Sequence, residues 1–464
     1  MNGNLYALLA SRFSADRTRP VFETLDGGAV SYGELEAGVG RLAALLKARG
    51  VAVGDRVAVQ APKSIEAVML YLATLQIGAV YLPLNTAYTK AEIGYFISDA
   101  QPALIVADAI ELAAEAASLA PLEAIHAAAE SDLAAIVYTS GTTGRSKGAM
   151  LSHGALAANG LALTEAWGFA SSDVLLHALP IYHVHGLFIA LHCVFLAGAR
   201  ALWLAKFDET EVLAGMARAT VMMGVPTFYT RLLADARFTR QAAEKMRLFI
   251  SGSAPLLPST FAEFEDRIGQ PLLERYGMSE AAIITTNPLH GARIAGSVGY
   301  PLPGVALRVA DDGLVQIKGP SVTTGYWRNP EKTAEAFTAD SYFITGDVGR
   351  QDPDGRLWLS GRSSDLIISG GLNVYPKEVE LVLDEMAGVV ESAVIGLPHR
   401  DFGEAVAAVV VGAGDEAAMI AAARAQLAAF KCPKRVIFVP DLPRNAMGKV
   451  LKAELRRRYA DTFS

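Results

Sequence analysis

The stretch DLAAIVYTSGTTGRSKG (residues 132–148) passes from a short apolar run directly into a segment with almost no apolar side chains. The first part is typical of a buried strand, and the second consists of glycines, hydroxyl-bearing residues and two cations. Glycine lets backbone N–H groups curl around an anion without a side-chain clash, while hydroxyls and a lysine add donors and charge. The stretch therefore predicts a phosphate-binding loop at the end of a buried strand.

The spacing of this loop is Gly-x-x-Gly-x-x-Lys-Gly, which differs from the Gly-x-x-x-x-Gly-Lys-Ser/Thr of a Walker loop. A flexible surface loop is the alternative interpretation. The strand pattern before the loop and the helix-like HGALAANGLALTEAW after it favour a nucleotide site.

Helix-like and strand-like segments alternate on both sides of the loop. SYGELEAGVGRLAALLKARG (31–50) has apolar residues at helical spacing, a Ser N-cap with Glu34 three positions later and a terminal glycine, and a strand-like RVAVQAP follows. ALIVADA and RLFISGSA repeat the pattern of a short buried strand that ends in small polar residues. We expect a layered α/β fold, in which ligands gather at the carboxyl ends of strands.

The pattern changes near residue 360. LWLSGRSSDLIISGGLNVYPKEVE (357–380) contains two strands, two polar turns and a helix start within 24 residues, and short helices and strands follow with few insertions. This is typical of a compact domain of about 100 residues. We predict a large N-terminal domain (1–361) built from several subdomains and a small, mobile α+β C-terminal domain (362–464), with a hinge near Ser364.

Composition excludes several classes of protein. The 464-residue chain has a net charge of −7, which argues against general nucleic-acid binding and electrostatic membrane binding. Its two cysteines, Cys193 and Cys432, are too few for a disulfide framework and are expected to be structural thiols. No apolar run has the length of a membrane span and the N-terminus lacks a secretory signal pattern, so a cytoplasmic location is expected.

The loop and five later stretches resemble the signatures of the adenylate-forming superfamily, which includes acyl-CoA synthetases, nonribosomal adenylation domains and luciferases. In chain order these stretches are SGSAPL (251–256), ERYGMSE (274–280), ITGDVG (344–349), SGRSSDLIISGGLNVYPKEVE (360–380) and PRNAMGK (443–449). Six motifs in the same order, over nearly the whole chain, make chance similarity negligible. The resemblance implies a two-domain acyl-CoA synthetase that uses ATP, Mg2+ and coenzyme A.

The resemblance also implies roles for single residues. Glu280 would hold the ATP-bound Mg2+ through a hard carboxylate oxygen, and Lys147 would bind phosphates. Lys449 would lie over the acid and the α-phosphate, where two unit charges about 4 Å apart repel by ~4 kcal/mol at an effective dielectric near 20. An acetyltransferase acting on Lys449 is a further expectation from the resemblance.

The nucleotide and coenzyme A contacts follow from the same motifs. Tyr276 would face adenine, Asp347 would accept the ribose hydroxyls and Arg362 would reach ribose or phosphate; a packing tyrosine, a turn-capping aspartate and a solvated arginine are the alternatives. The implied ATP contacts are Thr139, Ser140, Gly141, Thr142, Thr143, Gly144, Lys147, Ser253, Ala254, Pro255, Glu274, Arg275, Tyr276, Gly277, Ser279, Asp347, Arg362 and Lys449. Ser369, Gly370 and Gly371 would line the path of the pantetheine arm after rotation about Ser364.

The acid pocket is expected between LPIYHVHGL (179–187) and GVPTFYTRLL (224–233). Arg231, if turned into this pocket, would bind a second carboxylate through two parallel hydrogen bonds, whereas a surface position is the alternative. MGVPTFYTRLL, FISGSAPL, LERYGMSE and LPRNAMGKV look closest to malonyl-CoA synthetases, which implies malonate or methylmalonate as the acid. The expected acyl-pocket residues are His183, His185, Arg231, Ser253, Met278 and Ile283.

Three other functions are weighed against this one. An adenylation module would transfer the same or another small acid to a carrier protein instead of free coenzyme A. An inactive nucleotide-binding regulator would have no need for both Lys449 and Glu280, which are present. A metal-dependent ATPase would need a group that activates water, and the sequence offers no evident candidate.

Overall fold

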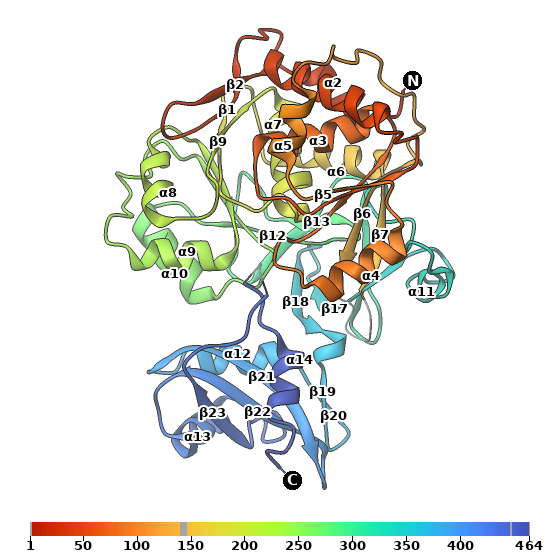
Figure 1. The fold of residues 1–464 in the computed structure, drawn as a ribbon. Coiled ribbons are helices and arrows are strands. Elements are labelled where there is room, and N and C mark those ends of the chain that lie inside the picture. Colours follow the sequence, from red (N-terminus) through yellow and green to blue (C-terminus); the bar gives the residue numbers. More distant parts are fainter. Residues whose placement is uncertain (1, 140–145, 446–447, 464) are drawn as a thin grey trace.

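The computed structural model describes residues 2–139, 146–445 and 448–463, called the described residues below. The chain forms a large N-terminal part and a smaller C-terminal part that lies below it in the view of Figure 1. Mixed helices and strands build both parts, so the expected α/β fold with one large and one small unit is confirmed. Among the described residues, no helix combines the length and the apolar character needed to cross a bilayer.

The phosphate-loop stretch lies in a five-stranded sheet of the N-terminal part, with the order β5-β3-β4-β6-β7. These strands are β3 (Arg56–Val59), β4 (Val80–Pro83), β5 (Leu104–Val106), β6 (Leu133–Thr139) and β7 (Lys147–Ser152). The apolar run forms the buried strand β6, as predicted, and pairs antiparallel with β7 so that Thr139 lies opposite Lys147. Both residues thus flank the loop itself, whose residues 140–145 are not described.

The second sheet of the N-terminal part has 13 strands in the order β15-β16-β17-β18-β14-β13-β12-β11-β10-β8-β9-β1-β2. The strands are β1 (Pro20–Glu23), β2 (Ala29–Ser31), β8 (Val174–His177), β9 (Arg200–Trp203), β10 (Val221–Gly224), β11 (Leu248–Ser251), β12 (Leu273–Met278), β13 (Ala282–Thr286), β14 (Ser297–Pro301), β15 (Ala306–Val309), β16 (Leu314–Lys318), β17 (Phe343–Gln351) and β18 (Leu357–Arg362). Parallel pairing from β9 through β12 gives way to antiparallel pairing from β13 onward. The carboxyl ends of β11 and β12 therefore face the same edge of the sheet.

Helices cover these two sheets. They are α1 (Leu5–Arg12), α2 (Tyr32–Ala48), α3 (Ile65–Gln76), α4 (Lys90–Ala100), α5 (Ala109–Ala116), α6 (His153–Ala166), the π-helix η1 (His185–Leu191), α7 (His192–Ala197), α8 (Glu209–Met216), α9 (Pro226–Ala234), α10 (Pro258–Ile268) and α11 (Pro330–Glu335). The helix expected at 31–50 is confirmed as α2, and Ser31 and Glu34 form its capping box. A large core of buried Leu, Val, Phe and Tyr side chains joins α1, α2, α3, α6 and α7 to both sheets.

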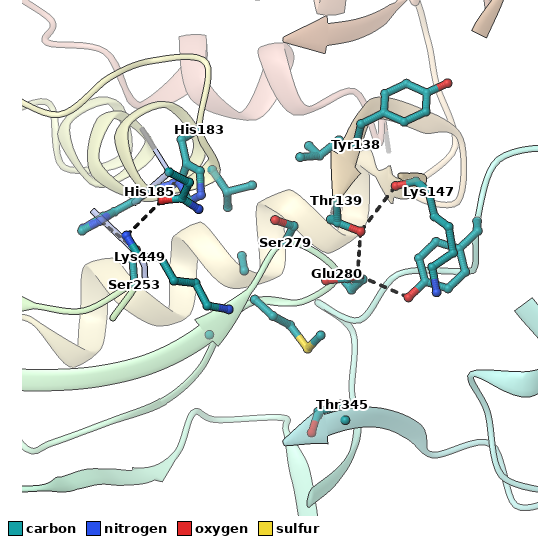
Figure 2. A pocket seen from close by; sticks show the side chains of 18 of the residues that line it. Tyr138, Thr139, Lys147, His183, His185, Ser253, Ser279, Glu280, Thr345 and Lys449 are labelled. Atoms are coloured by element: carbon teal, nitrogen blue, oxygen red, sulfur yellow. Dashed lines mark hydrogen bonds between the residues drawn. The ribbon is translucent and has the colours of Figure 1, made fainter. Parts of the chain in front are cut away.

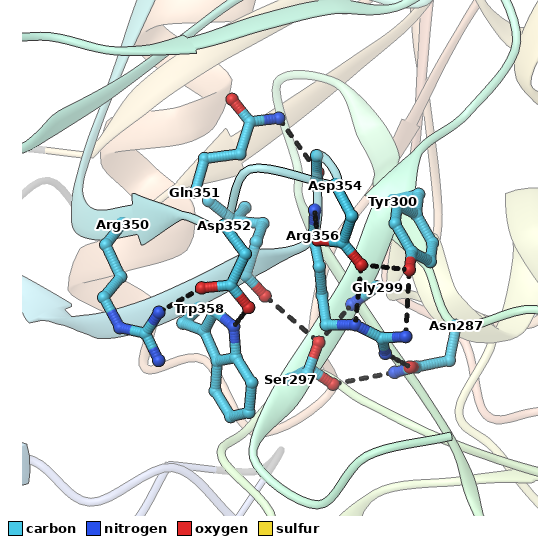
Figure 3. A network of polar contacts seen from close by, with 12 residues as sticks. Asn287, Ser297, Gly299, Tyr300, Arg350, Gln351, Asp352, Asp354, Arg356 and Trp358 are labelled. Atoms are coloured by element: carbon cyan, nitrogen blue, oxygen red, sulfur yellow. Dashed lines mark hydrogen bonds and ion pairs between the residues drawn. The ribbon is translucent and has the colours of Figure 1, made fainter. Parts of the chain in front are cut away.

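A buried polar network fixes the hairpin of β17 and β18 (Figure 3). Arg356, at 6% exposure, donates to Asn287 Oδ1 at 3.2 Å and to the hydroxyl of Tyr300 at 2.9 Å. Trp358 donates to Asp352 at 2.6 Å, which ties β18 to the end of β17. The strand that leads out of the N-terminal part is therefore held on both of its sides.

The chain changes sheets directly after β18. The 3-10 turn η2 (Ser363–Asp365) connects β18 to a separate five-stranded sheet, in which the order is β20-β19-β22-β21 and β23 pairs with β22. Its elements are β19 (Ile367–Ser369), β20 (Leu372–Val374), α12 (Pro376–Asp384), β21 (Val389–His399), β22 (Gly403–Gly412), α13 (Glu416–Gln426), β23 (Arg435–Val439) and α14 (Lys452–Arg458). This sheet has its own apolar core, which includes Ile367, Val394 and Val406. The change of sheet occurs next to the position proposed for the hinge.

Candidate active site

A cavity of about 670 Å3 lies where the five-stranded β3–β7 sheet, the 13-stranded sheet and the C-terminal part meet. Thr139 and Lys147 line it from the β6–β7 hairpin, Arg275 from β12, and Ser364 and Lys449 from the C-terminal side. Figure 2 shows the Lys449 side chain extending between the side that carries His183 and His185 and the side that carries Ser279 and Glu280. The cavity therefore brings together residues from all six motifs, since Ser253 and Thr345 also line it.

One end of the cavity is built for an anion beside a metal ion. Glu280 is buried and its Oε1 accepts from the Thr139 hydroxyl at 3.3 Å and the Tyr326 hydroxyl at 3.2 Å. The Lys147 ammonium lies 4.4 Å from the centre of the Tyr326 ring. A carboxylate and a lysine thus point into the space next to the loop. Ser140, Gly141, Thr142, Thr143 and Gly144, predicted to bind phosphate, lie outside the described residues.

The donor set at this end fits one type of metal. Within residues 2–139, 146–445 and 448–463, no group of three or more His, Cys, Asp or Glu side chains could hold a metal ion. Mg2+ is commonly bound by one or two carboxylates together with phosphate oxygens of the substrate. Glu280 meets that requirement, because it is a single buried carboxylate at the cavity wall.

The other end of the cavity holds a buried cation. Arg275 is 4% exposed, and its Nε and Nη2 have no hydrogen-bond partner among the described residues. Burial lowers the pKa of Arg275 to about 9, which still leaves the guanidinium charged at neutral pH. A buried charged group without a partner is costly, so the arrangement calls for an anionic ligand at this end.

Local backbone geometry creates the space for this guanidinium. Gly252 lies against it, and a Cβ at that position would come within 2.5 Å of Arg275 Nε. The next residue, Ser253, has a φ of +72°, a conformation that is rare for residues other than glycine. Its hydroxyl lies 3.2 Å from His185 Nδ1 (Figure 2). The SGSAPL turn after β11 therefore both makes room for the arginine and orients a histidine.

The two histidines at this end are uncharged. Burial and, to a smaller extent, the neighbouring Arg275 together lower the pKa of His183 to about 4. Burial also holds the pKa of His185 well below its usual range. His185 begins the π-helix η1, a geometry that is frequent at functional sites. Both imidazoles therefore offer hydrogen bonds without competing with Arg275 for an anion.

Lys449 enters the cavity from a tight turn of the C-terminal part. The amide of Lys449 donates to Asn445 Oδ1 at 3.0 Å, and the amide of Asn445 donates to the Lys449 carbonyl at 2.9 Å. Burial and the nearby Arg362 lower the pKa of Lys449, while Asp347 and Asp365 raise it. The Lys449 ammonium therefore lies near both positively and negatively charged side chains.

Asp347 and Tyr276 lie behind the wall of the cavity and do not line it. Asp347 is buried, with Oδ1 2.6 Å from Arg362 Nε and Oδ2 accepting from the Tyr276 hydroxyl. Arg362, Thr345 and Gly346 line the cavity in front of them. In this structure Asp347 therefore positions Arg362. Asp347 does not reach the cavity, so its contact with ribose stays a prediction.

The direction of strand β12 separates the predicted ATP contacts of this motif. Arg275 and Gly277 line the cavity together with Met278 and Ser279, whereas Glu274 does not. Successive side chains of a strand point to opposite faces, so Glu274 and Tyr276 point away when Arg275 points in. Glu274 instead accepts from the Gly296 amide at 3.1 Å, and burial raises its pKa to about 8. The Glu274 side chain therefore points away from the cavity in this structure, and its contact with ATP stays a prediction.

Three further predicted residues do not line the cavity. Ile283 is fully buried in the large apolar core, whereas its neighbour Ala282 lines the cavity. Ala254 and Pro255 follow Ser253 in the turn but are not part of the wall. The prediction that Ile283 contacts the acid is wrong, because the alternation of strand β13 turns it into the core.

Arg231 lies outside the acid pocket. It is on the exposed face of α9, where its Nε and Nη2 bind the two carboxylate oxygens of Glu209 at 2.5 and 2.7 Å. It also stacks over the Phe207 ring at 4.8 Å, and its side chain is 52% exposed. The prediction that Arg231 captures a second carboxylate is wrong, and Arg275 is the arginine that faces the cavity.

The predicted coenzyme A residues lie in the hairpin of β19 and β20. Gly370 and Gly371 have φ values of +60° and +80°, as a tight two-residue turn requires, and Ser369 pairs with Leu372. None of the three glycine and serine residues lines the cavity. Their proposed role in a second arrangement of the domains stays a prediction.

Several residues of the cavity wall are not among those predicted from the sequence. Tyr326, Thr345 and Asn445 line the wall although none of them was singled out. Thr345 lies within the ITGDVG motif and Asn445 within PRNAMGK, so the motifs themselves were the available signal. Tyr326 lies in no motif, and its proximity to Glu280 arises only from the fold.

Comparisons with known proteins agree with the fold. Residues 10–327 match the family described as AMP-binding enzyme, and residues 378–449 match the AMP-binding enzyme C-terminal domain. The chain is 34% identical over 516 residues to a malonate–CoA ligase of Arabidopsis thaliana, which covers 93% of this chain and 85% of that protein. It is 36% identical over 469 residues to a feruloyl-CoA synthase of Amycolatopsis, with coverage of 93% and 94%.

A solved structure shows the same fold over the full length. ATP-bound MatB from Rhodopseudomonas palustris is 50% identical, covers 100% of both chains and gives a TM-score of 0.96. The fold and the cavity thus define a two-domain nucleotide-dependent enzyme. The chain belongs to the AMP-binding enzyme family, and the similarity inferred from the six motifs is confirmed.

Proposed function

We propose that the protein is an ATP-dependent malonate–CoA ligase, which forms malonyl-AMP and pyrophosphate and then malonyl-CoA and AMP. The observation that carries the choice of acid is Arg275, a buried guanidinium with no partner among the described residues at the far end of the cavity. The name of the relative from Arabidopsis thaliana, a malonate–CoA ligase, supports the same choice.

A dicarboxylate suits the two ends of this cavity. One carboxylate would bind Arg275, which offers a planar fork of donors, and neutral His185 and Ser253 would donate or accept beside it. The other carboxylate would face Lys449 and the reacting phosphate. An acid with an apolar end, such as ferulate, would leave the buried charge of Arg275 unpaired. The free-energy cost of that unpaired charge would make the site reject such an acid.

In the first half-reaction a malonate oxygen attacks the α-phosphorus of ATP, and the bond from that phosphorus to the pyrophosphate oxygen breaks. Lys449 offsets the repulsion between the two anions, and Lys147 stabilises the leaving pyrophosphate. This is catalysis by positioning and by fixed charge, since no proton has to move. Acetylation of Lys449 by an acetyltransferase would remove its charge and stop this step.

Glu280 would hold Mg2+ at the phosphate end of the cavity. When bound, the ion supplies positive charge to the phosphate oxygens. The hydroxyls of Thr139 and Tyr326 both donate to Glu280 Oε1, so they fix the direction of the carboxylate. The protein would thus supply one oriented carboxylate to the ion, and phosphate oxygens of ATP would supply further ligands.

In the second half-reaction the thiol of coenzyme A loses its proton to solvent and attacks the carbonyl carbon of malonyl-AMP. The carbon–sulfur bond forms, the bond from that carbon to the phosphate oxygen breaks, and AMP leaves. We propose that the C-terminal part rotates about Ser364, withdraws Lys449 and brings Ser369, Gly370 and Gly371 to the pantetheine arm. Ser364 supports this role because it lies in the short turn η2, directly between the two sheets.

A coupled assay over a panel of mono- and dicarboxylic acids tests this function. With ATP, Mg2+ and coenzyme A, we expect malonate to give AMP and malonyl-CoA with a higher kcat/KM than propionate, butyrate or ferulate. Preference for a monocarboxylic acid would overturn the choice of substrate. A requirement for a carrier protein in place of free coenzyme A would favour the adenylation-module alternative.

A further inference from the structure

The C-terminal helix α14 lies directly after the turn that presents Lys449. Within this turn the amide of Leu451 donates to the Pro443 carbonyl at 2.8 Å, and Arg444 pairs with Val450 in a short bridge. The turn is therefore a closed loop whose two ends move together. Because α14 begins at Lys452, three residues after Lys449, any shift of the helix shifts the turn.

Two ion pairs fix α14 to other elements. Lys452 Nζ lies 2.5 Å from Glu380 Oε1 on α12, and Glu380 is buried and also accepts from the Val394 amide at 2.9 Å. One turn further along, Arg456 Nη2 lies 2.9 Å from Asp365 Oδ1. The first pair anchors the helix within the C-terminal part, and the second connects it to η2.

Asp365 occupies a special position in the chain. It is the last residue of η2 and directly follows Ser364, and it lies 91 positions before Arg456 in the chain. It also acts electrostatically on Lys449, on Arg362 and on Asp347. A single carboxylate thus connects the proposed hinge, the C-terminal helix and the lysine in the cavity.

We propose that Asp365 is a positioning residue for the first half-reaction: its ion pair with Arg456 sets α14, and with it the Lys449 turn, against the nucleotide side of the cavity. This inference rests on the proposed function for the role of Lys449, although it does not depend on which acid is used. The side chains of Asp365 and Arg456 are only 24% and 29% exposed, so solvent screens this pair less than a surface pair.

The charge of Asp365 has a second effect on the same lysine. The charged groups that act on the pKa of Lys449 are Asp347 on β17, Arg362 on β18, Asp365 on η2 and Lys452 on α14. The other charged groups that line the same cavity are Glu92, Lys147, Arg275, Glu280, Lys332 and Glu335. Burial, Arg362 and Lys452 lower the pKa of Lys449, and Asp347 and Asp365 oppose them. Removal of the Asp365 charge would lower the pKa of Lys449 further, so the ammonium would be lost at a lower pH.

Three variants separate this role from general damage to the C-terminal part. Asp365→Asn and Arg456→Gln each remove one side of the pair without changing the size of the side chain much. Arg458→Gln is a matched control, because Arg458 lies on the same helix but pairs at 3.4 Å with Glu454 on the exposed face of α14. The readouts are acid-dependent exchange between pyrophosphate and ATP, and formation of the thioester from supplied acyl-AMP.

We expect Asp365→Asn and Arg456→Gln each to lower the exchange rate about tenfold, and the double variant to be no slower than either one. Arg458→Gln should stay within about twofold of the wild type. Thioester formation from supplied acyl-AMP should be unchanged in all of them, because Lys449 is not used there. The alkaline limb of the exchange profile of Asp365→Asn should move to lower pH.

The outcomes are distinguishable from failure of the proposed function. A wild type without acid-dependent exchange would overturn the proposed function itself. An active wild type with Asp365→Asn and Arg456→Gln equal to Arg458→Gln would overturn the role of Asp365. Equal loss of exchange and of thioester formation would mean that the pair stabilises the domain and does not position Lys449.

Discussion

At the scale of single residues, two cations of the cavity have separate tasks in the function proposed here. Arg275 lies on strand β12 in the N-terminal part, and Lys449 lies on a turn of the C-terminal part. Arg275 would select the acid by binding its second carboxylate, and Lys449 would stabilise the reacting carboxylate and α-phosphate. Because the two residues belong to different parts of the chain, a rotation of the C-terminal part could withdraw Lys449 while Arg275 stays in place.

Lys449→Ala should lower pyrophosphate release by about 10²-fold or more, because a charge aimed at the transition state is lost. The same variant should convert supplied malonyl-AMP to malonyl-CoA at the rate of the wild type. Both rates are measured by quantifying pyrophosphate and thioester separately. Equal loss in the two assays would contradict the assignment of Lys449 to adenylation alone.

Arg231→Gln should leave the KM for malonate within about twofold of the wild type, because an exposed ion pair contributes less than about 1 kcal/mol. Steady-state kinetics with malonate as the varied substrate check this expectation. A large increase in this KM would mean that Arg231 reaches the acid in a conformation other than the one described.

At the scale of elements, the sequence predicts strands and motifs well but does not decide which side chain faces the cavity. The hairpin of β6 and β7, the turn after β11 and the motif on β12 lie where the pattern indicated. For Arg231, the helical pattern of apolar residues already indicated a position outside the pocket. In α9 the buried Tyr229, Leu232 and Leu233 share one helical face, and Arg231 lies off that face.

Arg275 could not be selected in the same way. Strand alternation predicts that Glu274 and Arg275 point to opposite faces, but it does not say which face borders the cavity. That choice depends on how the β12–β13 hairpin packs against β11, which is a long-range contact. The contacts of Tyr326 with Glu280 are likewise a product of tertiary structure alone.

The network in Figure 3 makes a prediction about the hairpin that leads to the hinge. Arg356→Met should lower the free energy of unfolding by about 2 kcal/mol, because Asn287 and Tyr300 would lose a buried partner. Thermal unfolding measures this change. Arg350→Met is the matched control, since Arg350 lies on the same hairpin with its side chain 62% exposed. Equal melting temperatures of the two variants would contradict the structural role of Arg356.

At the scale of the whole molecule, the cavity is completed only when the C-terminal part closes on the N-terminal part as in Figure 1. The glycine hairpin of β19 and β20 lies away from this cavity. A second arrangement of the two parts would therefore be needed to bring that hairpin to the acyl-AMP. The short turn η2 is the place where the chain could absorb the change.

Ser364→Pro should impair thioester formation and spare adenylation, because proline fixes φ and restricts the residue before it. Pyrophosphate release in a single turnover, followed by thioester formation in the same sample, separates the two effects. A variant with full overall turnover would remove Ser364 as the hinge.

The central claim is that Arg275 selects an acid with a second carboxylate. The most direct measurement is the ratio of kcat/KM for malonate to kcat/KM for its monomethyl ester, which has a similar shape and one charge fewer, in the wild type and in Arg275→Leu. We expect the wild type to prefer malonate by about 10²-fold or more, and this preference to be lost in the variant. Equal use of the two acids by the wild type, or an undiminished preference in Arg275→Leu, would contradict the account.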